Sequence, residues 1–195
     1  MKSNQLSHNT LQLLKAYIAS HAVFNALTYV QNQIAADEKR AALKALSTFA
    51  NFIRKTADDI ESVHRSFAKE WEMLKVYCTL EQWRFGDRLS IQIDENLNEP
   101  IQTASFLFVP YVEQIILTGL ASNVDQLEIH IQNEQQKGLK VTCNFRLDST
   151  LSEHLNAEQD NRKQLLEERL ELLKENYQIS REIDQFTATL NIQLK

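Results

Sequence analysis

The sequence predicts an α+β protein in which an N-terminal antiparallel helical hairpin, residues 1–85, is followed by a two-layer α/β sandwich, residues 86–195. The first observation is that apolar residues recur every three or four positions up to Phe85, which is the period of an amphipathic helix. The second is that apolar and polar residues alternate directly after Gly86, which is the period of a β-strand. This change of period marks the boundary between the two predicted domains.

The first predicted helix runs from about Gln5 to Ile34. At about 100° per residue, four apolar side chains gather on one side of this helix and four polar side chains gather on the other. The apolar set is Val23, Leu27, Val30 and Ile34, and the polar set is His21, Asn25, Thr28 and Asn32. The pattern therefore predicts that His21 and Asn25 face solvent. Residues 35–37 form the predicted turn, with Asp37 as the N-cap of the next helix.

The second predicted helix carries a seam of apolar residues typical of a coiled coil. Its members are Leu46, Phe49, Ile53, Ile60, Val63, Phe67, Leu74 and Tyr77, with gaps at Thr56 and Glu70. Two alternatives stay open, because this helix either continues to Phe85 or breaks near residues 62–66, where Ser66 would cap a separate helix. A hairpin alone has too small a core, so we expect two copies to share the seam as a homodimer.

The second half of the chain alternates strand and helix patterns. The expected elements are a strand at 89–94, a loop at 96–105, a helix at 108–120 that opens at Pro110, strands at 127–131 and 139–145, a helix at 161–176, and strands at 177–183 and 187–194. This succession predicts a mixed, largely antiparallel sheet covered by helices on one face.

Composition excludes several classes of function. The net charge of −5, with acidic and basic residues interspersed, provides no basic stripe, so nucleic acid is not an expected partner. No apolar run is long enough to span a bilayer and the first residues lack a signal peptide's apolar core, so we expect a cytoplasmic protein without direct membrane insertion. Cys78 and Cys143 are expected to be reduced core residues, and the five scattered histidines predict no metal site.

Four segments resemble motifs of the LytS-like sensor histidine kinases, in the order and at the spacing of that family. Residues 14–27, LKAYIASHAVFNAL, resemble the L-K-x-Q-I-x-P-H-F-L-F-N-x-L histidine box. Residues 77–89 resemble the Y-L-x-x-E-x-x-R-F segment that leads into the ATPase domain. Residues 110–119, PYVEQIILTG, are similar to the P-L-V-E-N-A-I-K-H-G nucleotide box, and residues 168–173 to the E-R-L-x-L-L that follows the glycine-rich lid.

The resemblance implies that the second domain has the fold of a histidine kinase ATPase domain, of GHKL type. It also implies that His21 is the phosphoacceptor, with Asn25 assisting it, and that Glu113 and Gln114 stand in the nucleotide box as the general base and the magnesium-binding position.

Three motifs depart from the family pattern. Gln114 replaces the family's magnesium-binding asparagine, and Thr118 replaces the histidine of the same box. Residues 145–147, Phe-Arg-Leu, stand where the D-N-G motif should follow its strand, and residues 160–163 carry no glycine where the lid should lie. The whole chain holds only three glycines, and glycine is what lets backbone amides wrap phosphates. We therefore expect a degenerate nucleotide site and no bound cofactor.

The expected function is histidine phosphotransfer by a pseudokinase in two-component signalling. A solvent-facing imidazole with an ordinary pKa is partly neutral at physiological pH and can attack a phosphoryl group presented by another protein, such as the receiver domain of a response regulator. The first alternative is a non-catalytic dimeric interaction module descended from the family. The second is a histidine kinase that still uses ATP.

Overall fold

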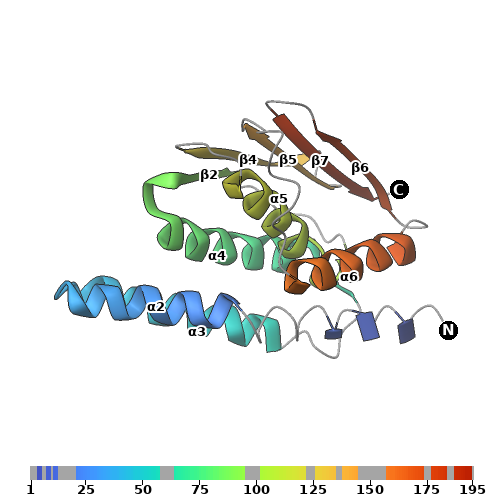
Figure 1. Cartoon of the computed structure of the whole chain (residues 1–195). Coiled ribbons are helices and arrows are strands. Elements are labelled where there is room, and N and C mark those ends of the chain that lie inside the picture. The colour runs from blue at the N-terminus through green and yellow to red at the C-terminus, as the bar shows by residue number, and fades with distance from the viewer. Residues whose placement is uncertain are drawn as a thin grey trace.

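The computed structural model describes residues 4–5, 8–9, 11–12, 21–57, 64–94, 102–121, 126–134, 138–144, 157–173, 177–183 and 187–194. Within them the chain is a mixed α+β protein, as predicted. Figure 1 shows three levels: the sheet, a layer containing α4, α5 and α6, and the α2–α3 hairpin beneath α4.

The hairpin consists of α2, His21–Ala35, and α3, Lys39–Ala57, which pack against each other. A Schellman motif ends α2, because the Glu38 amide bonds to Gln33 O at 2.8 Å and the Asp37 amide to Ile34 O at 3.0 Å. Asp37 is left-handed, with φ of 59°. The prediction that Asp37 caps α3 is therefore wrong, since an N-cap residue is extended and Asp37 instead closes the preceding helix.

The second predicted helix is broken into separate elements. After α3 comes the short strand β1, His64–Ser66, and then α4, Phe67–Phe85. Ser66 is the N-cap of α4, with an extended backbone and a side chain that accepts a hydrogen bond from the Lys69 amide. Of the two alternatives left open by the sequence, the break with a Ser66 cap is confirmed. Gly86 ends α4 with φ of +54°, a backbone conformation that favours glycine.

The predicted seam does not run along a single helix. Leu46 is 46% exposed, while Phe67, Leu74 and Tyr77 are buried in the same cluster as residues of the sheet. Ile60 and Val63 lie outside the described residues. The helical period was read correctly on both sides of the break, but the pattern belongs to two separate helices, and Ile53 of α3 packs against the cluster that holds Phe67, Leu74 and Tyr77.

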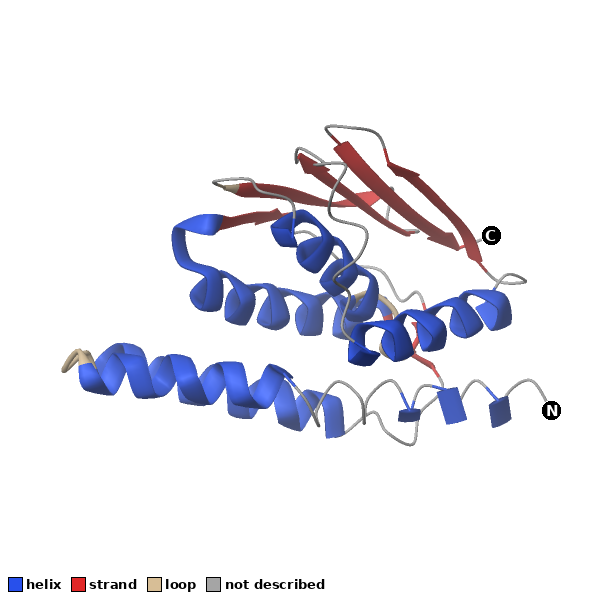
Figure 2. Ribbon diagram, in the orientation of Figure 1, coloured by secondary structure: helices blue, strands red, loops and turns tan. Residues whose placement is uncertain are grey.

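The sheet joins β2, Leu89–Ile93; β4, Leu127–Glu134; β5, Gly138–Asn144; β7, Thr187–Leu194; and β6, Tyr177–Ile183, in that order. The β2–β4 pair is parallel and the other pairs are antiparallel. Helices lie on one face of it (Figure 2), so the predicted mixed sheet with helical cover is confirmed.

A second, small sheet was not predicted. Strand β3, Gln102–Ala104, lies within the expected loop and pairs antiparallel with β1, so that His64 faces Ala104 and Ser66 faces Gln102. The pair ties the start of α4 to the segment that enters α5, Val109–Ala121. The last helix, α6, is Ala157–Leu173, so it begins four residues before the predicted start.

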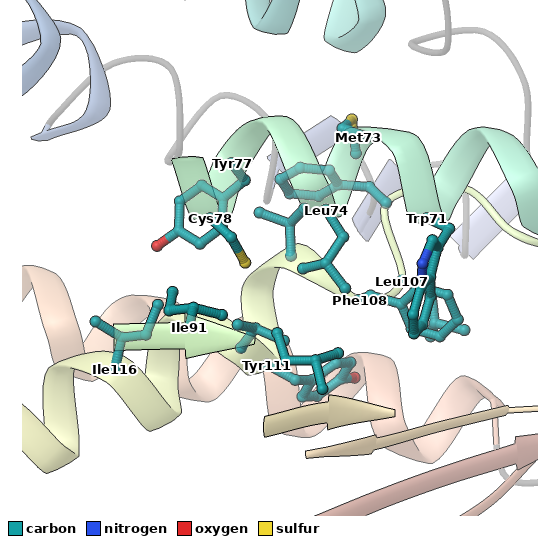
Figure 3. Packing of buried hydrophobic residues seen from close by; sticks show 14 of the residues in the cluster. Trp71, Met73, Leu74, Tyr77, Cys78, Ile91, Leu107, Phe108, Tyr111 and Ile116 are labelled. Carbon is teal, nitrogen blue, oxygen red and sulfur yellow. The ribbon is translucent and has the colours of Figure 1, made fainter. Parts of the chain in front are cut away.

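The core of the protein lies between α4, α5, α6 and the sheet. Its side chains include Trp71, Leu74, Tyr77 and Cys78 from α4, Ile91 from β2, Leu107, Phe108, Tyr111 and Ile116 around α5, and Leu166 and Leu173 from α6. Figure 3 shows Leu74 and Cys78 directed from α4 toward the side where Ile91 and Tyr111 lie. Helix α4 therefore contributes to the core of the sheet, although it precedes the predicted boundary at residue 86.

Candidate functional site

His21, the predicted phosphoacceptor, is the first residue of α2. Its side chain lies outside the described part of the structure, so the expectation that it faces solvent stays a prediction. Helix α2 contains no aspartate, glutamate, lysine or arginine. The facing helix α3 contains five basic residues, which are Lys39, Arg40, Lys44, Arg54 and Lys55. The part of the histidine box from His21 onward thus lies on an uncharged helix beside a basic one.

Asn25, the predicted assistant of His21, does not lie on an open polar surface. It is half-buried and lines a small cavity together with Glu81, Trp83 and Arg84 of α4. Its Nδ2 atom is buried and has no hydrogen-bond partner within the described residues. The prediction that the Asn25 stripe faces solvent is therefore wrong at Asn25, because the surface that α2 turns toward α4 includes this residue.

The expected apolar side of α2 is only partly open, because Val23 and Val30 are half-buried. Leu27 is 43% exposed and Ile34 is 60% exposed, although both were predicted to face inward. The other exposed large hydrophobic side chains are Phe24, Leu43 and Leu46, so both helices of the hairpin present apolar groups to solvent. Thr28 and Asn32 are exposed, as predicted. Within the described residues, the hairpin therefore has apolar side chains against α4 and others that are exposed.

The nucleotide-box residues lie on α5, whose first turn contains Pro110, as predicted. Glu113 and Gln114 are both half-buried on this helix. Toward its end, a Cβ added to Gly119 would lie 2.6 Å from Leu127 Cδ1, so glycine at this position allows α5 to approach β4 closely. Helix α4 contacts both the hairpin and α5 and lies between them (Figure 1), so the hairpin and the helix that carries the nucleotide box are on different sides of α4.

The segment entering α5 is held by Glu70, a residue that the sequence pattern treats only as a gap. Glu70 is fully buried, and its carboxylate accepts hydrogen bonds from the backbone amides of Phe106 at 2.5 Å, Leu107 at 3.0 Å and Phe108 at 3.4 Å. Arg65 of β1 forms an ion pair with the same carboxylate, with 2.6 Å between Nε and Oε1. Burial lowers the pKa of Arg65, while the charge of Glu70 and its hydrogen bond oppose that shift.

A second buried arginine reaches the same segment from α6. Arg169 is fully buried, and its guanidinium donates a hydrogen bond to the carbonyl of Ser105. Buried charges of this kind need partners, because an unpaired one is strongly destabilising. Arg65, Glu70 and Arg169 therefore position the start of α5 from three different elements. In the sequence, this network was indicated only by Glu70, an acidic residue inside an apolar helical pattern.

Of the two remaining departures from the family pattern, the structure describes the residues at the lid position but not those at the D-N-G position. Residues 145–147, which stand in place of the D-N-G motif, lie outside the described residues. Residues 160–163, which stand in place of the glycine-rich lid, are part of α6. Beyond the first turn of a helix, each amide is bonded to a carbonyl four residues earlier. The amides of residues 161–163 are therefore committed to the helix.

Two further features of the described residues bear on function. They contain no group of three or more histidine, cysteine, aspartate or glutamate side chains that could hold a metal ion. Among the helices whose residues are described, none combines the length and the apolar character needed to cross a membrane. Cys78 is a free, buried thiol, as predicted, whereas the side chain of Cys143 is not among those described.

A family model described as histidine kinase matches residues 9–89. The chain is 34% identical over 114 residues to the sensor histidine kinase YpdA of Escherichia coli, an alignment that covers 56% of this chain and 19% of the relative. It is 28% identical over 119 residues to the sensor protein LytS of Staphylococcus haemolyticus, covering 60% of this chain and 19% of that relative. The chain thus spans about a fifth of the length of these curated relatives.

Among solved structures, the chain is similar to one described as a bacterial phosphotransferase. That likeness covers 97% of this chain and 96% of the other, with a TM-score of 0.44 and 10% sequence identity. Agreement at this level is too distant to support any comparison of function, so the relationship rests on the sequence matches and the motifs.

Proposed function

Since this chain is related to the LytS-like sensor histidine kinases, we propose that it is a two-component signalling protein in which His21 accepts and passes on a phosphoryl group without bound ATP. Its layout in this proposal is a histidine hairpin joined to a degenerate ATPase-type domain. The main observation in favour of lost ATP binding is that residues 160–163, at the position of the lid, lie in helix α6. Helical amides cannot wrap phosphates in the way that glycine-rich loops do.

The nucleotide box supports the same conclusion. Gln114 carries one methylene more than the asparagine that holds magnesium in the family, and it is half-buried on α5. Magnesium requires near-ideal octahedral geometry, so a displaced amide oxygen weakens such a site. Glu113, the general base in the family, then has no nucleotide on which to act.

The proposed chemistry uses a phosphoryl group that another protein supplies. The lone pair of a neutral His21 nitrogen attacks the phosphorus of an acyl phosphate on a receiver domain. A P–N bond forms while the acyl P–O bond breaks, the receiver's aspartate leaves as a carboxylate, and the resulting imidazolium can release its other ring proton to solvent. Neither ATP nor a metal on this chain enters the balance of this step.

A second copy of the chain is the proposed partner for the open side of the hairpin. Phe24, Leu27, Ile34, Leu43 and Leu46 are between 43% and 68% exposed in the single chain. Large apolar residues exposed on the same hairpin favour an interaction surface, and two hairpins joined through such residues make a four-helix bundle. Sedimentation of the wild type should give a dimer at micromolar concentration, and Leu27→Glu with Leu43→Glu should give a monomer.

One observation favours a second candidate, an interaction module without chemistry. Asn25 faces α4 in this structure, so the residue proposed to assist His21 is not presented to a docked receiver domain. In this alternative the hairpin pairs and binds a partner, while His21 and Asn25 have no chemical role.

The experiment follows radiolabelled phosphate on the purified chain. One arm supplies a panel of phosphorylated receiver domains, and the other supplies labelled ATP with magnesium. Label from a receiver that is lost in His21→Gln but kept in His8→Gln supports phosphotransfer. Label from ATP that depends on His21 shows an active kinase instead. A dimer that takes label from neither source, and binds its partner equally well as His21→Gln, is an interaction module.

A further inference from the structure

A second cavity, larger than the one beside Asn25, lies between the N-terminal segment and α6. The segment is described at residues 4–5, 8–9 and 11–12, and Figure 1 shows it on the side of α6 away from the sheet. The Asn9 side chain joins the two, because its Nδ2 atom donates a hydrogen bond to the Leu165 carbonyl at 3.1 Å. The cavity has a volume of about 590 Å³, which is within the range of small-molecule sites.

The cavity combines an apolar floor with an acidic wall. The floor consists of Leu165 and Leu172, two residues of α6 that are half-buried and pack against the core. The exposed carboxylates of Glu168 and Glu171, also on α6, form the acidic wall. The N-terminal segment contributes side-chain amides and one imidazole, from Asn4, Gln5, His8, Asn9 and Gln12. Since the described lining residues include no lysine and no arginine, the cavity favours a cation.

Asn9 has an unused hydrogen-bond acceptor at the wall of this cavity. The residue is only 5% exposed, and its Oδ1 atom is buried without a partner among the described residues. A buried carbonyl oxygen without a donor is unfavourable, so a ligand that brings an N–H group to it is bound more tightly. The Glu168 carboxylate accepts a hydrogen bond from Gln164 at 3.2 Å, and a carboxylate has the capacity to accept several.

Helix α6 is a rigid support for these side chains and lies apart from the nucleotide box. Leu166 and Leu173 anchor it in the core, and the buried Arg169 donates a hydrogen bond to the Ser105 carbonyl. The described lining residues include none from the nucleotide box, residues 110–119, and none from the lid position, residues 160–163. The cavity is therefore separate from the degenerate nucleotide site.

We propose that this cavity binds a small organic cation, consisting of a primary ammonium group on a short apolar chain. The ammonium group has three N–H donors, which match the carboxylates of Glu168 and Glu171 and the carbonyl of Asn9. The apolar chain of the ligand covers Leu165 and Leu172. Two exposed glutamates alone form an ordinary solvated helix face, whereas here they border an apolar floor and a buried acceptor. The inference goes beyond the proposed phosphotransfer and requires no chemistry at His21.

The test titrates three probes of the same carbon skeleton into the purified chain and follows the leucine methyl groups by NMR. The probes are isopentylammonium, the neutral isopentanol and the anionic isovalerate. We expect isopentylammonium to shift the methyl signals of Leu165 and Leu172 and to bind more tightly than the other two probes. Removing one exposed carboxylate, in Glu168→Gln or Glu171→Gln, should weaken its binding roughly 2- to 5-fold. Glu167→Gln removes the same charge outside the cavity and should bind as the wild type does.

A fourth probe tests the role of Asn9. Isopentyltrimethylammonium keeps the positive charge but has no N–H group, so the wild type should bind it roughly 2- to 10-fold more weakly than isopentylammonium. The difference should shrink in Asn9→Ala, which lacks the side-chain carbonyl. Circular dichroism checks that the variant is folded, and if it is not, the two glutamine variants still test the site with Asn9 intact.

The outcomes are distinct from those of the phosphotransfer assay. Preference for isopentylammonium, weakened in Glu168→Gln and Glu171→Gln but not in Glu167→Gln, supports the cation site. Equal binding of isopentanol, unshifted leucine methyls, or equal affinity in all three glutamine variants overturns it. Equal binding of the trimethylated probe by the wild type overturns the part assigned to Asn9. Failure of phosphotransfer leaves the inference standing, because none of these measurements uses His21.

Discussion

The hairpin and the α4–sheet unit bury their apolar residues to very different extents, although similar helical patterns specify both. In α4, Trp71 and Leu74 are fully buried, whereas Leu43 of α3 is 65% exposed and Ile34 of α2 is 60% exposed. The α4–sheet unit completes its core within one chain. The hairpin has apolar groups on two sides and covers only one of them, so a helical period shows that a residue packs somewhere without showing against which chain.

The strongest test of this difference removes a buried charge and an exposed charge from the same helix. Glu70→Ala removes the ion-pair partner of the buried Arg65 and the carboxylate that accepts from three backbone amides, so it should lower the free energy of unfolding by about 3–5 kcal/mol. The Glu72 side chain is 56% exposed and forms an ion pair with Lys75. Glu72→Ala removes this pair and should lower the free energy of unfolding by less than about 1 kcal/mol. Urea denaturation measures both, and equal losses would contradict the buried network.

Leucine truncation makes the same comparison without charge. Leu74→Ala opens a cavity in the core and should lower the free energy of unfolding by about 2–5 kcal/mol. Leu43→Ala should change it by about 0.5 kcal/mol or less in the isolated chain. Denaturation at low protein concentration checks the pair. At higher concentration Leu43→Ala should lower the dimer fraction, and a large loss of monomer stability would show that Leu43 is not exposed.

The close approach of α5 to β4 predicts a smaller effect at Gly119. An added Cβ would overlap the buried Leu127 side chain, and such overpacking costs about 1–3 kcal/mol, of which alanine's helix propensity offsets about 1 kcal/mol. Gly119→Ala should therefore destabilise by about 1 kcal/mol. In a Leu127→Ala background, thermal unfolding should show the same substitution to be neutral or stabilising. Destabilisation of the same size in both backgrounds would exclude the clash.

The smallest effect concerns the reactivity of a thiol rather than stability. Burial raises the pKa of Cys78, and the charge of Glu81 raises it further, so little thiolate forms at neutral pH. Labelling at Cys78, followed by peptide mass spectrometry, should be roughly 100-fold slower than at an exposed Leu43→Cys and should become fast in urea. Similar rates in the native state would refute this protection.

The raised pKa also gives a pH dependence of stability. Because the folded thiol keeps its proton at a pH where the unfolded thiol loses it, the folded state binds more protons above the ordinary thiol pKa of about 8.5. The stability contributed by Cys78 is therefore complete below that pH and declines as the pH rises above it. Denaturation at pH 7 and pH 9.5 should show a larger decline for the wild type than for Cys78→Ala.

Much of the fold could be predicted because its patterns are local. The alternation at Leu89–Ile93 predicted β2, the polar break before Gly138 predicted the β4–β5 hairpin, and Pro110 indicated the first turn of α5. The three-residue pair of β1 and β3 could not be predicted, because such short strands carry no recognisable period and their pairing joins residues far apart in the chain.

The candidate site was predicted less completely. The motifs indicate His21, Asn25, Glu113 and Gln114 as candidate residues, whose roles stay predictions, and the sequence comparisons support the family. The direction of Asn25 was missed, because a helix with apolar groups on two sides leaves its inward face ambiguous until α4 is placed against it. The roles of Arg65, Glu70 and Arg169 were missed because their partners are backbone groups or side chains on other elements.

The sequence by itself predicted the order of the larger helices and strands, offered Ser66 as one possible cap, and contained the motifs that indicate the family, since each depends on residues within a few positions of one another. Only the tertiary structure decided that α4 joins the core of the sheet, that the amide of Asn25 faces α4, and that Trp83 contacts both helices of the hairpin. These contacts join segments separated along the chain, and the free energy of such packing depends on which surfaces meet.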